Sequence, residues 1–170
     1  MTQDTLLPVL LVAQGVMGAV DTLVNHELIE RLPHRSEART EIGLHSIREA
    51  VYATLFGGLA WFAWHGALAA VIGVLLVSEV LVTACDEFIE NHTRVVPQNE
   101  RVLHVFLTLN LGLLIAVVMP TLLSWAARPT ALIPISHGML SWALSALAIA
   151  ALVWSLRDLL AWRRLSRYRS

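Results

Sequence analysis

Five long apolar runs limit what this chain can fold into more than any other feature of its sequence. They cover residues 6–28, 42–64, 67–89, 102–125 and 138–162. Each run is long enough to cross a bilayer, because a hydrocarbon core about 30 Å thick takes roughly 20 helical residues. Charged residues make up only 15% of the chain, whereas soluble domains are about 25% charged. The runs therefore predict an integral membrane protein.

The runs are predicted to be helices. They are continuous, whereas the strands of a membrane barrel alternate in segments of about ten residues. A helix also satisfies its backbone hydrogen bonds internally, as lipid requires. We therefore expect an all-α fold in which residues 1–170 form a single membrane domain of five transmembrane helices.

Arginines predict the orientation of these helices. They gather in the connection at residues 30–40, around the connection at 93–101 and in the tail after residue 162, whereas the opposite side carries only Arg128. The positive-inside rule makes the arginine-rich side cytoplasmic. We expect an inner-membrane protein with its N-terminus outside and its C-terminus in the cytoplasm.

Net charge and cysteine content exclude several classes of protein. The formal net charge is -1, so no basic surface favours nucleic acid. The single cysteine, Cys85, excludes an intramolecular disulfide and any site built from several thiolates. A Gly-x-Gly-x-x-Gly motif is typical of flavin or nicotinamide binding. The chain has no such motif.

A polar pattern occurs twice along the chain. The first and third runs each carry three polar residues separated by seven and four positions, which are Gln14, Asp21 and Asn25, then Glu79, Asp86 and Glu90. These spacings keep each set on one helix face. The second and fourth helices each begin with Glu-x-x-x-His, which is Glu41 with His45, then Glu100 with His104.

The two patterns predict a duplicated helical hairpin. Repeat 1 covers residues 6–64 and repeat 2 covers residues 67–126. The two hairpins enter the membrane in the same direction, so they would be related by an axis along the membrane normal. We expect them to form a four-helix bundle, to which residues 138–162 add a fifth helix.

The polar residues of both repeats fall in the cytoplasmic half of this bundle. Ionised groups near lipid cost at least a few kcal/mol each, so several on converging faces require a cation. Carboxylates and imidazoles without thiolate suit iron, manganese or zinc. The candidate ligands, helix by helix, are Asp21 or Glu27; Glu41, His45 and Glu49; Asp86 or Glu90; Glu100 and His104. His26 lies near these groups, and an ordinary interfacial histidine is the alternative for it. Glu90 could be a ligand or, alternatively, form an ion pair with Arg94 four residues later.

This pattern resembles the ferritin-like di-iron carboxylate proteins. Those bundles are built from a duplicated helical hairpin, with one carboxylate from each of two helices and a Glu/His pair from each of the other two. The resemblance implies two metal ions per chain, most simply iron. The family spacing is Glu-x-x-His, whereas both copies here are Glu-x-x-x-His. A spacing of four also keeps two ligands on one helix face, as in H-E-x-x-H zinc sites.

Two further residues are candidates for catalysis. Glu79 lies about two helical turns deeper than Asp86, and an acid inside the membrane is by default a functional residue. Arg48 lies beside the acids and histidine of the second helix. The alternative for Glu79 is a structural pairing with Gln14.

We expect a membrane-bound metalloenzyme that oxidises, hydroxylates or desaturates a lipid-soluble substrate arriving from the bilayer. Because no flavin or nicotinamide motif is present, an electron-donor protein would have to supply electrons. A zinc-dependent lipid hydrolase is the alternative within this class.

Other classes remain open. Glu79 and Gln14 could continue a path for a proton or metal-ion transporter. His45 and His104 could be axial haem ligands. A structural membrane subunit would use Arg48, Arg94 and Arg101 in an ion-pair network. Whether the fifth helix packs on the bundle or forms a homo-oligomer is also open.

Overall fold

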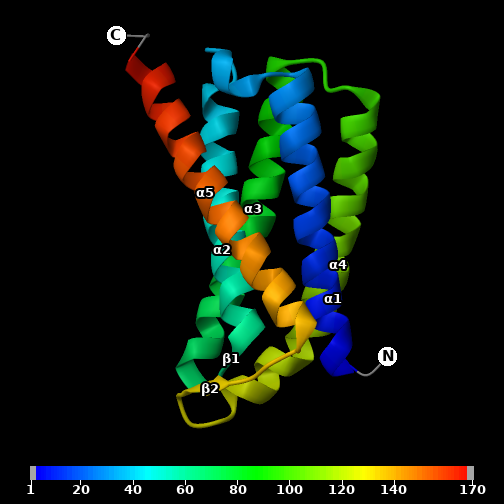
Figure 1. The fold of residues 1–170 in the computed structure, drawn as a ribbon, viewed down its shortest axis with the longest axis vertical. Coiled ribbons are helices and arrows are strands. Elements are labelled where there is room, and N and C mark those ends of the chain that lie inside the picture. Colours follow the sequence, from blue (N-terminus) through cyan, green and yellow to red (C-terminus); the bar gives the residue numbers. More distant parts are fainter. Residues whose placement is uncertain (1–2, 168–170) are drawn as a thin grey trace.

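The computed structural model describes residues 3–167, and the long elements in that range are five helices (Figure 1). They are α1 (Gln3–Val20), which continues as the π-helix η1 (Asp21–Ile29), then α2 (Arg39–Trp61), α3 (Ala69–Thr93), α4 (Gln98–Ala126) and α5 (Met139–Arg167). Short 3-10 turns occur at η2 (Leu32–His34) and η3 (Gly66–Leu68). The predicted all-α class is confirmed.

Four segments of the described chain are long and apolar enough to cross a membrane. They are Thr5–Ile29, Gly66–Thr93, Gln98–Ala126 and Met139–Arg167. The prediction of membrane helices is therefore confirmed for four of the five predicted runs. The remaining helix, α2, is less apolar because its first half carries Glu41, His45, Arg48 and Glu49.

The helix α2 lies at the centre of the arrangement. Its buried face includes Leu55, Leu59 and Ala60, each at most 2% exposed, which pack against Leu11 of α1 and Leu144 of α5. An enclosed helix can be more polar than helices that face lipid, because neighbouring helices cover its polar groups. This position accounts for the lower hydropathy of α2.

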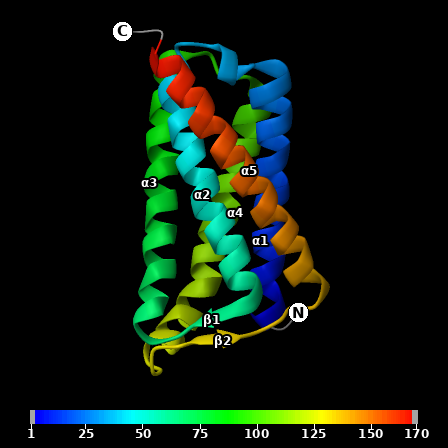
Figure 2. The same ribbon diagram turned by 60° about the vertical axis from the view of Figure 1, so that its left-hand side comes forward.

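The last helix, α5, slants across α2 and makes its most extensive contact there (Figures 1 and 2). Ser46 Oγ donates to the carbonyl of Ser155 at 2.9 Å, and Ser155 Oγ donates to the carbonyl of Ser46 at 2.8 Å. Gly43 lets the indole of Trp162 approach, because a Cβ at Gly43 would lie 3.0 Å from Trp162 Cδ1. Small residues and reciprocal hydrogen bonds are typical of helix contacts in membranes.

The strands β1 (Phe62–Trp64) and β2 (Leu132–Pro134) form a short antiparallel pair, with Ala63 opposite Ile133. This pair lies at the same end of the bundle as the start of α1 (Figure 2). Gly66 follows with a φ of 61°, and a Cβ there would lie 2.3 Å from Thr130 Oγ1, so the turn requires glycine. We call the end of the bundle that holds β1, β2 and residues 127–138, with the adjoining helix ends, the far end.

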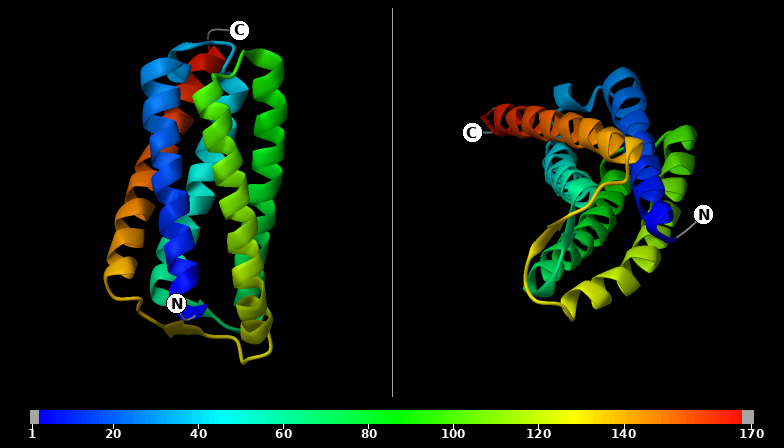
Figure 3. Two further views of the ribbon diagram at one scale, coloured as in Figure 1. Left: turned by 90° about the vertical axis from the view of Figure 1, so that its right-hand side faces the viewer. Right: turned by 60° about the horizontal axis from the view of Figure 1, so that its bottom comes forward.

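The opposite end of the bundle holds the connections η1–α2 and α3–α4 and the end of α5 (Figure 3). The main apolar core, which includes Leu55, Ile72 and Leu114, fills the bundle toward the far end. Most of the buried acids and histidines lie beyond this core, at the end opposite to the strand pair, whereas the buried His65 lies beside the strand pair.

Candidate metal centre

The π-helix η1 positions the first group of polar side chains. Its backbone hydrogen bonds span five residues, as the bond from Glu30 N–H to Asn25 O at 2.8 Å shows. In this wider turn, Asp21, Asn25 and His26 are all buried. Asn25 Nδ2 donates to Asp21 Oδ1 at 2.7 Å, and Asn25 Oδ1 accepts from Asn99 at 2.7 Å. Short π segments are frequent at functional sites.

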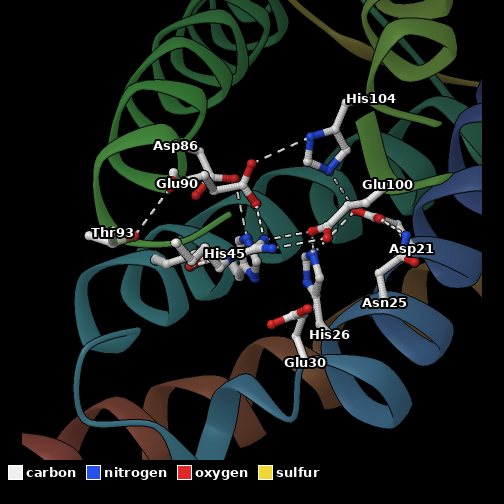
Figure 4. Close-up of polar contacts among 12 residues, drawn as sticks. Asp21, Asn25, His26, Glu30, His45, Asp86, Glu90, Thr93, Glu100 and His104 are labelled. Atoms are coloured by element: carbon white, nitrogen blue, oxygen red, sulfur yellow. Dashed lines mark hydrogen bonds and ion pairs between the residues drawn. The ribbon is translucent and has the colours of Figure 1, made fainter. Parts of the chain in front are cut away.

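Three imidazoles meet between four helices (Figure 4). The rings of His26 and His45 stack with centroids 4.4 Å apart. His45 Nε2 lies 3.2 Å from Asp86 Oδ2, and His104 Nε2 lies 3.2 Å from Asp21 Oδ2. The contacts are reciprocal, because each histidine of the Glu-x-x-x-His pattern meets the acid of the other hairpin.

Arg94, in the connection after α3, pairs with three acids. Its Nη2 lies 2.8 Å from Glu41, 2.6 Å from Glu90 and 2.6 Å from Glu100, all carboxylates at most 1% exposed. Burial disfavours the charged guanidinium, but hydrogen bonds from Arg94 to Glu100 and Glu41 raise the pKa of Arg94 above its ordinary value. The ion pair of Glu90 with Arg94 is therefore present in the structure.

The described residues include three groups whose ligand atoms lie within 4.8 Å of one another. The groups are Asp21, His26, Glu100 and His104; His26, Glu41, His45 and Glu90; Glu87, Glu90 and His104. Two ligands bound to one ion at about 2.1 Å are at most about 4.2 Å apart, so small side-chain movements would bring each group to binding distance. The two larger groups share His26, which places them side by side.

We call the acids and histidines of this region the polar cluster. It comprises Asp21, His26, Glu41, His45, Asp86, Glu90, Glu100 and His104. Counting the deeper Glu79, and leaving aside Asp158, which pairs with Arg157 of α5, six carboxylates at or beside it are at most 4% exposed in the described chain. Arg48 and Arg94 contribute two positive charges there, so four negative charges (6 − 2) remain when all six carboxylates are ionised. Protons on the carboxylates or imidazoles, or bound cations, would balance them.

The two candidate catalytic residues lie on one chain of polar contacts that ends at the polar cluster. Thr83 Oγ1 donates to Glu79 Oε1 at 3.2 Å, and Arg48 Nε lies 3.5 Å from the same oxygen. Arg48 Nη1 lies 3.0 Å from Asp86 Oδ2, which contacts His45. Glu79 and Arg48 are thereby linked to a histidine of the polar cluster.

Gln14 pairs with Tyr52 and Asn110 and not with Glu79. Its Nε2 donates to the hydroxyl of Tyr52 at 2.8 Å, and its Oε1 accepts from Asn110 Nδ2 at 2.7 Å. These are contacts between α1, α2 and α4, deeper in the bundle than the polar cluster.

The structure brings together most of the candidate ligands but not all of them. Asp21, Glu41, His45, Glu90, Glu100 and His104 belong to the two larger groups. Glu27 instead pairs with Arg157 of α5. Glu49 and Asp86 lie outside the three groups, although Asp86 contacts His45.

His26 is the member of the polar cluster that sequence reasoning missed. It is five positions after Asp21, and residues five apart lie on different faces of an α-helix. The π-helix brings them to one face. His26 Nε2 then lies 3.2 Å from Glu100 Oε1 and 3.5 Å from Asp21 Oδ2. Nothing in the periodicity of the sequence indicates the π-helix.

A cavity of about 200 Å³ adjoins the polar cluster. Its lining includes His26, His45 and His104 at one side and apolar residues of the bundle at the other. The arrangement combines a set of oxygen and nitrogen donors with a space in which a small apolar molecule can lie beside them.

Comparisons of this chain with protein-family models, with curated proteins and with solved structures find no match.

Proposed function

We propose that this protein is an integral membrane metalloenzyme whose polar cluster holds two divalent metal ions. The observation that carries the proposal is the pair of ligand groups sharing His26. Together the two groups contain one carboxylate from η1, one carboxylate from α3, and a Glu/His pair from each of α2 and α4. This is the distribution of ligands in di-metal carboxylate bundles.

Charge supports the same proposal. Two divalent ions carry four positive charges, which equals the four negative charges that the two arginines leave unbalanced. Burying uncompensated carboxylates is costly. Metal ions would also be bound by neutral imidazoles, so His26, His45 and His104 would not need to be protonated.

The donor set favours iron, with zinc and manganese as the alternatives, because it combines carboxylates with imidazoles and includes no thiolate. Asp21, Glu100 and His104 would hold one ion, Glu41, His45 and Glu90 the other, and His26 would lie between them. Bound iron would supply dioxygen chemistry for the oxidation, hydroxylation or desaturation of a lipid-soluble substrate. An electron-donor protein would be the partner, and bound zinc would instead support lipid hydrolysis.

The membrane arrangement is part of the proposal. α2 would be the fifth span, shielded by α1, α3 and α5, and the arginine-rich end with the polar cluster would face the cytoplasm. The reciprocal contacts of His45 with Asp86 and of His104 with Asp21 support a duplicated hairpin. The metal centre would then lie between the two copies.

One observation favours a second candidate function. Arg94 pairs with Glu41, Glu90 and Glu100 at the position that a metal ion would share. With protonated histidines, this network would be complete without metal. The protein would then be a structural membrane subunit.

Metal analysis decides between the two functions. The full chain is purified in mild detergent without chelators, and its metal content is measured by mass spectrometry as isolated and after anaerobic incubation with Fe²⁺, Mn²⁺ or Zn²⁺. We expect about two ions per chain, as in di-metal bundles. Folded protein that retains no metal under any of these conditions would establish the ion-pair network and overturn the proposal.

A further inference from the structure

Six buried side-chain atoms in residues 3–167 have no hydrogen-bond partner. They are His26 Nδ1, Arg48 Nε, Glu49 Oε2, Glu79 Oε2, Asp86 Oδ1 and Trp154 Nε1. Buried polar atoms in native proteins are nearly always paired, and each exception calls for an explanation. All six residues line the same cavity beside the polar cluster. A ligand in that cavity would lie beside all six residues.

Most of the rest of the cavity wall is apolar, and part of this apolar wall leads toward the surface between α1 and α5. It includes Gly18 of α1, Phe56 of α2, Leu111 of α4, and Leu147 and Ala151 of α5. α1 and α5 are in contact, and both contain segments apolar enough to cross a membrane. A ligand reaching the cavity by this route would come from the bilayer.

Three of the five exposed lining residues lie along this route, Ala19 at the end of α1, Leu23 in η1 and Ala150 in α5. The other two, Glu87 of α3 and Thr108 of α4, line the cavity on the side of α3 and α4. Small residues on both helices leave room for a narrow chain. The cavity therefore joins the lipid-facing surface to the polar cluster.

The unpaired atoms restrict the chemistry of the ligand. Arg48 Nε, which lies 3.5 Å from Glu79 Oε1 but makes no hydrogen bond, and Trp154 Nε1 are donors. Glu49 Oε2 and Glu79 Oε2 are acceptors. A hydroxyl group both donates and accepts, so it matches such a mixed set. A carboxylate would instead face Glu49, Glu79 and Asp86, which disfavours an anionic ligand.

We propose that this cavity binds an uncharged single-chain lipid with a hydroxyl end group. The hydroxyl lies at Arg48 and Glu79, and the chain runs along Gly18, Leu147 and Ala151 between α1 and α5. The carbon atoms nearest the hydroxyl then lie beside the polar cluster. That this lipid is a substrate rests on the proposed metalloenzyme function, whereas its binding does not.

Photolabelling tests the binding site directly. The probe is hexadecanol carrying a photoreactive diazirine in its chain, applied to the purified full chain, and labelled residues are mapped by mass spectrometry. We expect labels on the cavity-lining residues of α1, α4 and α5 that excess hexadecanol suppresses. The matching diazirine fatty acid should label them about tenfold less, a difference of about 1.4 kcal/mol in binding.

Two matched glycine variants sharpen the test. A Cβ at Gly18 or at Gly73 meets no atom within 4 Å, but only Gly18 lines the cavity. Gly18→Leu fills the cavity and should lower the hexadecanol label by about tenfold, whereas Gly73→Leu should leave it unchanged. If Gly18→Leu does not fold, Ala151→Leu fills the same cavity from α5.

The outcomes separate this proposal from the proposed function. Equal labelling in both glycine variants, or equal labelling by the fatty acid, overturns the lipid site. Metal content should stay unchanged in Gly18→Leu, because Gly18 lies outside the ligand groups. Selective labelling of a protein that binds no metal overturns only the metalloenzyme.

Discussion

The two ends of the bundle satisfy their polar groups in different ways. At the far end, Ser141 Oγ donates to the carbonyl of Ala60 at 2.7 Å, and the backbone N–H of His137 donates to Ser141 Oγ at 2.8 Å. Trp61 Nε1 donates to Ser145 Oγ at 2.8 Å. At the other end, six carboxylates adjoin two arginines, and the unpaired buried atoms of the described chain gather there.

The difference separates a region built for stability from a region built for binding. Neutral hydrogen bonds within the protein make the far end self-sufficient. The polar cluster has excess negative charge and unpaired atoms, which reduce stability unless something binds. The largest differences between the ends should therefore appear when metal and charge are changed.

Substituting the histidine pair at one end should lower metal binding, whereas substituting the pair at the other end should not. We expect the double substitution of His45 and His104 to alanine to lower metal content by about tenfold or more, because even supporting groups around a metal change affinity by 10–100-fold. The matched control replaces His65 and His137 at the far end and should retain the metal. Equal metal loss in both double variants would remove the distinction between the ends.

Arg94→Ala should cause the largest loss of stability. It leaves Glu41, Glu90 and Glu100 without their guanidinium partner, and breaking a buried ion pair from one side costs about 3–5 kcal/mol. Denaturant unfolding of metal-free protein in detergent measures this change. Arg101→Ala, at an exposed position of α4, is the control and should change stability by less than about 0.5 kcal/mol. A similar small effect of Arg94→Ala would contradict the charge argument.

Ser141→Ala should weaken the far end without affecting metal. Ser141 is fully buried and makes two hydrogen bonds, so its loss leaves the Ala60 carbonyl and the His137 N–H unpaired. We expect a decrease of about 1–3 kcal/mol in the free energy of unfolding. We also expect the metal content of the same preparation to be unchanged. A loss of metal in Ser141→Ala would show that the two ends are coupled.

Glu27→Gln should have the smallest effect. The ion pair of Glu27 with Arg157 is partly exposed, and such pairs contribute about 0.2–1 kcal/mol. Metal content should stay at the wild-type value, whereas Asp21→Asn should reduce it. The reverse result would make Glu27 the ligand from the first helix.

The helices were largely predictable from the sequence because each is marked by continuous apolarity. The predicted runs 67–89 and 138–162 correspond to Ala69–Thr93 and Met139–Arg167. The helices α3 and α5 extend further because their polar last turns give no apolar signal. The slant of α5 across α2 was not predictable, since the serines and glycines that form this contact carry no periodic signature.

The candidate site was partly predictable because some of its residues follow a regular spacing along one helix. A spacing of four in Glu41 with His45 and in Glu100 with His104 indicated shared helix faces, and both pairs lie in the ligand groups. His26 was missed because only a π-helix aligns it with Asp21. The three contacts of Arg94 depend on how α2, α3 and α4 meet, which sequence spacing along one helix does not report.

The contact of α5 with α2 has a consequence for biogenesis. The chain is made from the N-terminus, so α2 emerges well before α5, its principal partner. Until then, the reciprocal hydrogen bonds of Ser46 with Ser155 cannot form. The contact of α5 with α2 is therefore completed only after α5 has left the ribosome.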